Sequence, residues 1–118
     1  MKDYKFDFNA NGKNYSLVFN LNVMQSIQEE YGTVQAWGAL TDRNSGSEID
    51  AKALIFGLRE MLNEAIDIAN ETREQAEKEP FLTLKQVGRI ITQIGLKESA
   101  EQLNQLIIES TKTEEKNA

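Results

Sequence analysis

The sequence predicts an α+β fold that is mostly α, in which an N-terminal two-stranded antiparallel hairpin packs on four to five helices. Near the N-terminus, hydrophobic residues alternate with polar ones on both sides of an Asn-Gly pair, which is a strong short-range signal of a hairpin. After residue 20, apolar residues instead recur at spacings of three and four, the period of a helix that buries one side. Two stretches also resemble capping boxes, which mark helix N-termini.

The predicted hairpin spans residues 4–19. With Asn11 and Gly12 as a two-residue type I′ turn, Ala10 pairs with Lys13. The same register then pairs Phe8 with Tyr15, Phe6 with Leu17 and Tyr4 with Phe19. Because side chains alternate between faces, these apolar pairs share one face of the hairpin. The other face carries Lys5, Asp7, Ser16 and Val18. A lone hairpin is marginally stable, so its apolar face should rest on the helices.

The helices are predicted from residue 21 to about residue 110. Asn20 or Asn22 caps the first, which ends at Gly32, and a short helix around Trp37 precedes a loop at 41–47. A long helix follows the capping box of Ser47 and Asp50. Its apolar stripe ends at residue 69, and no breaker occurs before residue 80, so 70–80 is open between helix, hinge and disorder.

The C-terminal part is predicted to be a helical pair. Thr83 and Gln86 form the clearest capping box, and Gly95 separates the two helices. The polar tail, residues 111–118, is predicted to be disordered. The chain is therefore expected to be one domain over residues 1–110.

Composition excludes several classes of function. The chain has no cysteine, which excludes disulfides and thiolate sites, and no histidine, the commonest general base and nitrogen ligand. Its net charge of −6 disfavours phosphate binding, and Glu98 and Glu101 stand where a helix-turn-helix would approach DNA. No apolar run reaches the roughly 18 residues of a membrane span, and no signal peptide is expected. We expect a cytoplasmic protein that binds neither nucleic acid nor membrane.

One row of carboxylates follows the long helix at steps of four and three: Glu60, Glu64, Asp67, Glu71 and Glu74. Carboxylate metal sites in helical bundles pair such residues with histidines, which this chain lacks. A solvated helix face or a docking surface for a basic partner explains the row better than a metal does. No nucleophile motif or glycine-rich phosphate loop is present. We expect no enzyme, no metal and no cofactor.

Two surfaces are candidate partner-binding sites. A hairpin leaves strand edges that can accept a strand from a neighbour, although capping a helical core is an equally good explanation of it. The candidate residues on the hairpin are Lys5, Asp7, Ser16 and Val18, and those on the long helix are Glu60, Glu64, Asp67 and Glu71. Trp37 and Tyr31 fall on apolar helical stripes and are expected in the core rather than at an exposed anchor site.

The segments FNANGKNYSLVF and IQEEYG, followed by an acidic helical body, resemble the tail assembly chaperones of long-tailed phages and prophages. The motifs cover the first third of the chain, and the remainder is similar in size, charge and helicity. The resemblance implies a non-enzymatic protein of the bacterial host cytoplasm. Such a protein coats the tape measure protein during tail morphogenesis, is absent from the finished virion and often self-associates. Two alternatives stay open: a structural connector or minor tail protein of the particle, and a small acidic regulator that binds another protein.

Overall fold

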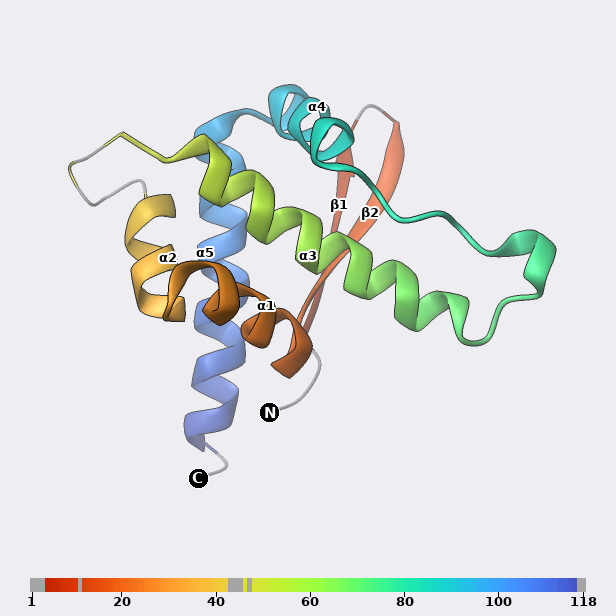
Figure 1. The fold of residues 1–118 in the computed structure, drawn as a ribbon, viewed down its shortest axis with the longest axis horizontal. Helices are drawn as coiled ribbons and strands as arrows, with labels where there is room; N and C mark the ends of the chain where they lie inside the picture. The colour runs from red at the N-terminus through yellow and green to blue at the C-terminus, as the bar shows by residue number, and fades with distance from the viewer. Residues whose placement is uncertain (1–3, 11, 43–45, 47, 117–118) are drawn as a thin grey trace.

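The structure is a computed structural model that describes residues 4–10, 12–42, 46 and 48–116. Within these ranges it contains two strands, five α-helices and one short 3₁₀ helix. Their bounds are β1 Tyr4–Ala10, β2 Lys13–Phe19, α1 Leu21–Tyr31, α2 Val34–Thr41, α3 Ala51–Asn70, η1 Gln75–Glu77, α4 Leu84–Ile94 and α5 Leu96–Lys116. The predicted α+β class, with a hairpin ahead of helices, is confirmed (Figure 1).

Helix α3 crosses the middle of the molecule, and the other elements are arranged around it (Figure 1). Its main tertiary contact is with β2, and it also contacts α1, α2, α4 and α5. Residues from nearly every element meet in one buried cluster that includes Phe19, Ile27, Trp37, Leu54 and Leu103. None of the helices in the described ranges is long and apolar enough to cross a bilayer.

The hairpin has the predicted antiparallel register at every position from Tyr4↔Phe19 to Ala10↔Lys13. Gly12 has φ 80°, the positive value that a type I′ turn requires. Leu17 and Phe19 are each 1% exposed, so the apolar face of β2 does enter the core. Val18, predicted on the solvent face, is also buried. The cause is the packing of β2 against α3, which places Val18 in the same hollow as Leu62 and Ala65.

The helix starts follow the predicted capping chemistry with one correction. The side chain of Asn20 accepts from the Val23 amide and caps α1, and the Thr83 and Gln86 capping box is present at α4. At α3, the side chain of Asp50 itself accepts from the Ala53 amide at 3.0 Å. Asp50 is therefore the N-cap of α3 and not its third residue, as the predicted capping box required. The other member of that box, Ser47, lies outside the described residues.

The end of α3 settles the conformation that the sequence left open for residues 70–80, and the end of α5 differs from its prediction. Helix α3 stops at Asn70, and the chain then turns through η1 into an extended segment, so residues 70–80 are not a continuation of the long helix. In contrast, α5 continues to Lys116, although a disordered tail from residue 111 is predicted. The tail contains no glycine or proline, and its Glu and Lys residues are good helix formers, so nothing local ends the helix there.

Trp37 locks α2 onto α3 and is fully buried, which confirms its predicted core position. Its indole Nε1 donates to the Ala53 carbonyl at 2.8 Å. The ring lies directly over Gly57, where an added Cβ would be 2.2 Å from Trp37 Cζ2. Gly57 is therefore required by the close approach of the indole to the α3 backbone.

Gly57→Ala should lower the free energy of unfolding by about 1–3 kcal/mol, because overpacking against the indole outweighs the gain in helix propensity. Gly88 on α4 is the matched control, since a Cβ there would be an ordinary 3.6 Å from Ile55 Cδ1. Gly88→Ala should raise stability by up to about 1 kcal/mol. Urea unfolding of both variants measures this, and equal effects at the two positions would contradict the packing described for Trp37.

Tyr31 ends α1 with its ring against Phe56, at a centroid distance of 5.6 Å and an interplanar angle of 72°. Its hydroxyl oxygen is buried, and no group within the described ranges forms a hydrogen bond with it. Burial raises the pKa of Tyr31 above its ordinary value of 10.0, and the carboxylates of Asp50 and Glu30 raise it further. The folded state thus favours the neutral phenol.

Because the pKa of Tyr31 is higher in the folded state, its contribution to the free energy of unfolding is intact below the unfolded-state pKa of about 10. This contribution is lost as the pH rises through the folded-state pKa. Tyr31→Phe removes the titrating group, so stability should fall less steeply above pH 10 than in the wild type. At pH 7 the variant should be as stable as the wild type or up to about 1 kcal/mol more stable, because an unpaired buried hydroxyl is removed. Thermal unfolding from pH 7 to 11 measures both effects, and parallel pH profiles would refute this account.

Candidate protein-binding groove

The outer edge of β2 has unpaired backbone groups. In an antiparallel pair, every second residue directs its N–H and C=O away from its partner strand, and in this register those residues are Asn14, Ser16 and Val18. Within the described part of the chain, no hydrogen bond from another element reaches these backbone groups. At Asn14 and Ser16 the edge is therefore open to a further strand, whereas Val18 is 4% exposed and the edge is covered there.

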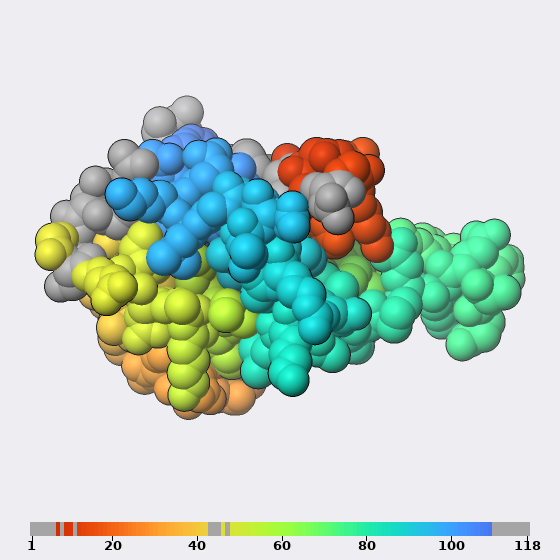
Figure 2. All heavy atoms as spheres, turned by 90° about the horizontal axis from the view of Figure 1, so that it is seen from above, coloured from red at the N-terminus to blue at the C-terminus, as the bar shows by residue number. Residues whose placement is uncertain are grey.

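This edge forms one wall of a groove of about 470 Å³. Helix α3 supplies an apolar floor of Leu62, Ala65, Ile66, Ile68 and Ala69. The opposite wall is the extended segment after η1, which we call the strap and define as residues 78–83. Figure 2 shows the chain between α3 and α4 projecting from the body of the molecule next to the hairpin. The groove thus combines a strand edge with an apolar floor.

Two asparagine side chains fix the strap onto α3. Asn70 accepts from the Glu79 amide at 3.0 Å and donates to the Glu79 carbonyl at 2.9 Å. Asn63 does the same for Leu82, at 2.8 and 3.1 Å. The two asparagines are seven residues apart, which places them on one side of the helix. These four bonds set the distance between the strap and α3, and so the width of the groove.

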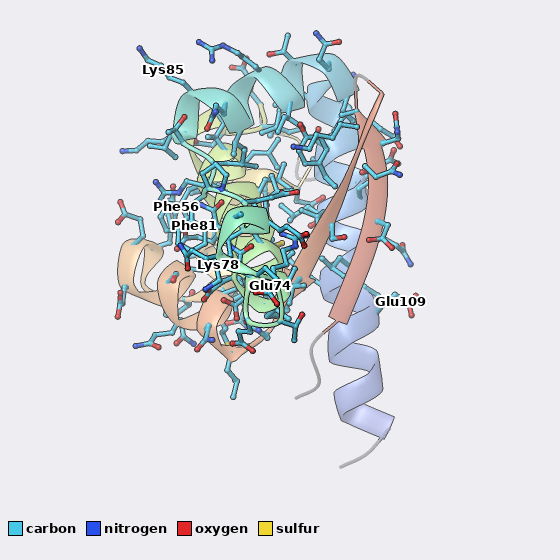
Figure 3. The ribbon with its side chains drawn as sticks, turned by 90° about the vertical axis from the view of Figure 1, so that its right-hand side faces the viewer. Phe56, Glu74, Lys78, Phe81, Lys85 and Glu109 are labelled. Carbon is cyan, nitrogen blue, oxygen red and sulfur yellow. The ribbon has the colours of Figure 1, made fainter. Side chains whose placement is uncertain are left out.

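Residues 80–82 of the strap present their side chains alternately to two sides, as an extended chain does. Pro80 and Leu82 line the groove beside β2, whereas Phe81 lines a shallow hollow on the α1 side. Figure 3 shows Phe81 on the side of α3 away from the hairpin. Phe81 is 56% exposed, so the strap leaves an aromatic ring on the surface.

A second hollow of about 500 Å³ adjoins the groove at the tip of the hairpin and runs along α4. The two share Lys13, Tyr15, Leu82 and Gln86 as lining residues. Basic residues predominate among the charged residues described along both: Lys13, Arg73 and Arg89 against the one acid Glu79. The groove is therefore locally basic, although the chain has 19 acidic and 13 basic residues.

The predicted hairpin residues do not form one surface. Asp7 and Ser16 lie opposite each other, and the Ser16 hydroxyl donates to the Asp7 carboxylate. Val18 is buried and lines the groove, so its side chain is not on an exposed edge. Lys5 pairs with Val18 in the register, and its side chain lies outside the described residues.

The predicted row of carboxylates is only partly formed. Glu60, Glu64 and Asp67 lie together on the α1 side of α3, around a hollow of about 150 Å³ that also contains Phe81. Glu64 accepts from the amides of Asn20 and Asn22, and Glu60 pairs with Arg59 at 3.3 Å. Glu71 follows the end of α3, and Glu74 lies beyond the next turn, so neither extends the row.

The groove itself was not predicted from the sequence. Its width depends on Asn63 and Asn70, and their seven-residue spacing was the available signal in the sequence. A polar residue on a helix does not reveal which distant backbone group it binds.

Within the described part of the chain, no three carboxylates come together in a way that could hold a metal ion. No protein-family model, curated protein or solved structure matches this chain.

Asn63→Ala and Asn70→Ala should release the strap, because each removes two hydrogen bonds to one backbone residue. We expect amide hydrogen exchange at Leu82 and at Glu79, respectively, to accelerate by at least about tenfold. Gln102→Ala is the control, since it removes an exposed side-chain bond to Glu98 on α5. Exchange rates at Glu79 and Leu82 that match those of this control would show that the asparagines do not hold the strap.

Proposed function

We propose that this chain is a non-enzymatic tail assembly chaperone of a long-tailed phage or prophage, which binds the tape measure protein during tail morphogenesis. The proposal places it in the cytoplasm of the bacterial host. The observation that carries its protein-binding role is the groove, where an unpaired strand edge faces the apolar side of α3. Such an edge binds polypeptide through backbone hydrogen bonds and is of little use to a small polar ligand.

The phage part of the proposal rests on the resemblance of FNANGKNYSLVF and IQEEYG to that family. The structure supports it to the extent that both motifs form well-defined local elements. The first is a hairpin in register about Gly12, and the second closes α1 at Gly32, which has φ 88°. The acidic remainder folds as helices around them.

A chaperone of this kind has to hold a client without completing a permanent interface. The groove suits that task, because its volume of about 470 Å³ accommodates a short segment rather than a whole domain. Many copies, each on one segment, would cover a long client and leave it free when tail tube subunits replace them. Weak individual contacts summed along one chain are sufficient for such coverage.

The test begins with the gene. A very long reading frame of coiled-coil character downstream should encode the client, and we expect its product to co-purify with this chain on co-expression. Ala69→Tyr, which fills the groove floor, should weaken that complex by at least about tenfold, the equivalent of about 1.4 kcal/mol. Ala36→Tyr, at an exposed position on α2, is the matched control and should bind as the wild type does.

Two outcomes would overturn the proposal. Recovery of the chain from purified virions would make it a structural component of the particle. A gene with no tail genes around it, together with no complex with any coiled-coil product, would favour a small regulator of another protein.

A further inference from the structure

We propose that the groove binds an extended segment of a partner protein, in which apolar side chains alternate with acidic ones, by adding that segment as a third strand to the outer edge of β2. This inference deepens the proposed function and rests on it for the existence of a protein client. It adds the conformation of the bound segment, which must be an extended stretch outside the helices of the client, and the sign of its charge.

The extended conformation follows from the hydrogen-bonding groups. The outward N–H and C=O groups of Asn14 and Ser16 are two residues apart, a spacing that an added strand matches and a helix does not. They span roughly 7 Å, the length of about three extended residues, before the edge becomes buried at Val18. The strap cannot itself pair with β2 through Glu79 and Leu82. The backbone N–H and C=O groups of these two residues are already bonded to the side chains of Asn70 and Asn63.

The alternation follows from the floor. A strand beside β2 directs every second side chain toward α3, where Leu62, Ile66 and the two alanines lie. Ala65 and Ala69 have short side chains, which leaves space for apolar groups of the incoming segment. The intervening side chains point away from α3 toward the open side of the groove.

The sign of the charge follows from the residues at the walls and ends. Lys13 lies next to the hairpin turn, Arg73 in the turn after α3 and Arg89 on α4. The carboxylate of Glu79 is 4.0 Å from Arg73 Nη1, so it offsets only one of these cations. Acidic side chains on the incoming segment would complement the remaining charge, whereas basic ones would be repelled.

The test uses the full chain and synthetic seven-residue peptides with acetylated and amidated ends. One peptide alternates glutamate with valine, and a second replaces each glutamate by lysine. Two-dimensional NMR should show that the acidic peptide binds at least about fivefold more tightly than the basic one. Its binding should shift the amide signals of Asn14 and Ser16 and slow their hydrogen exchange.

Two further acidic peptides test the backbone pairing. One is N-methylated at every valine and the other at every glutamate, so that each loses the N–H groups along one edge of the strand. Pairing with β2 requires that one of the two peptides binds at least about tenfold more weakly than the unmethylated peptide. Unchanged binding of both would overturn the proposed strand addition.

Charge reversal tests the groove itself. Lys13→Glu combined with Arg89→Glu should weaken binding of the acidic peptide by at least about fivefold. Lys97→Glu together with Lys52→Glu makes the same change in charge outside the groove lining and should have less than a twofold effect. Equal losses in the two double variants would overturn the assignment of the site.

Sedimentation of the free chain tests whether the groove is instead occupied by a second copy of this chain. A dimer that the acidic peptide does not dissociate, with unshifted Asn14 and Ser16 signals, would overturn the inference in favour of self-association. The peptides require no client, so this result is independent of the co-purification experiment. If the peptides bind but no tape measure complex forms, only the proposed function is contradicted. If the tape measure complex forms and the charge-reversed double variant binds it as the wild type does, only this inference is contradicted.

Discussion

The structure depends on the packing of β2 against α3. A two-stranded sheet does not bury enough apolar surface to persist by itself, and here Leu17 and Phe19 gain that burial from the helical core. The same contact buries Val18 and orients the outer edge of β2 along the C-terminal half of α3. The packing of β2 on α3 therefore both stabilises the hairpin and determines where its outer edge lies.

The strap converts that arrangement into a groove. Without a second wall, the β2 edge would be an exposed strand that invites nonspecific association, the hazard that natural proteins usually avoid. Asn63 and Asn70 hold the extended backbone in place by bonding both polar groups of Leu82 and Glu79. The same bonds leave those strap residues with no free backbone group for an added strand. A confined edge of this kind can select a bound segment by side-chain size and charge.

The sequence was most informative where local chemistry decides the structure. The Asn-Gly turn and alternating aromatics determine the hairpin register, and Thr83 with Gln86 determines the start of α4. The sequence was least informative where contacts between distant residues determine the structure. Val18 is buried by a helix more than forty residues away in the chain, and α3 stops at Asn70 with no glycine or proline to announce it. The groove was missed for the same reason, since its walls come from segments far apart in the sequence.

The most direct test of the account is hydrogen exchange along β2 in the free protein. Tyr15 and Leu17 direct their amides at β1, whereas Asn14 and Ser16 direct theirs into the groove. We predict an alternating pattern, with slow exchange at residues 15 and 17 and exchange at least about tenfold faster at residues 14 and 16. Uniform protection of all four amides would mean that the edge is already paired, and the groove could not then accept a strand.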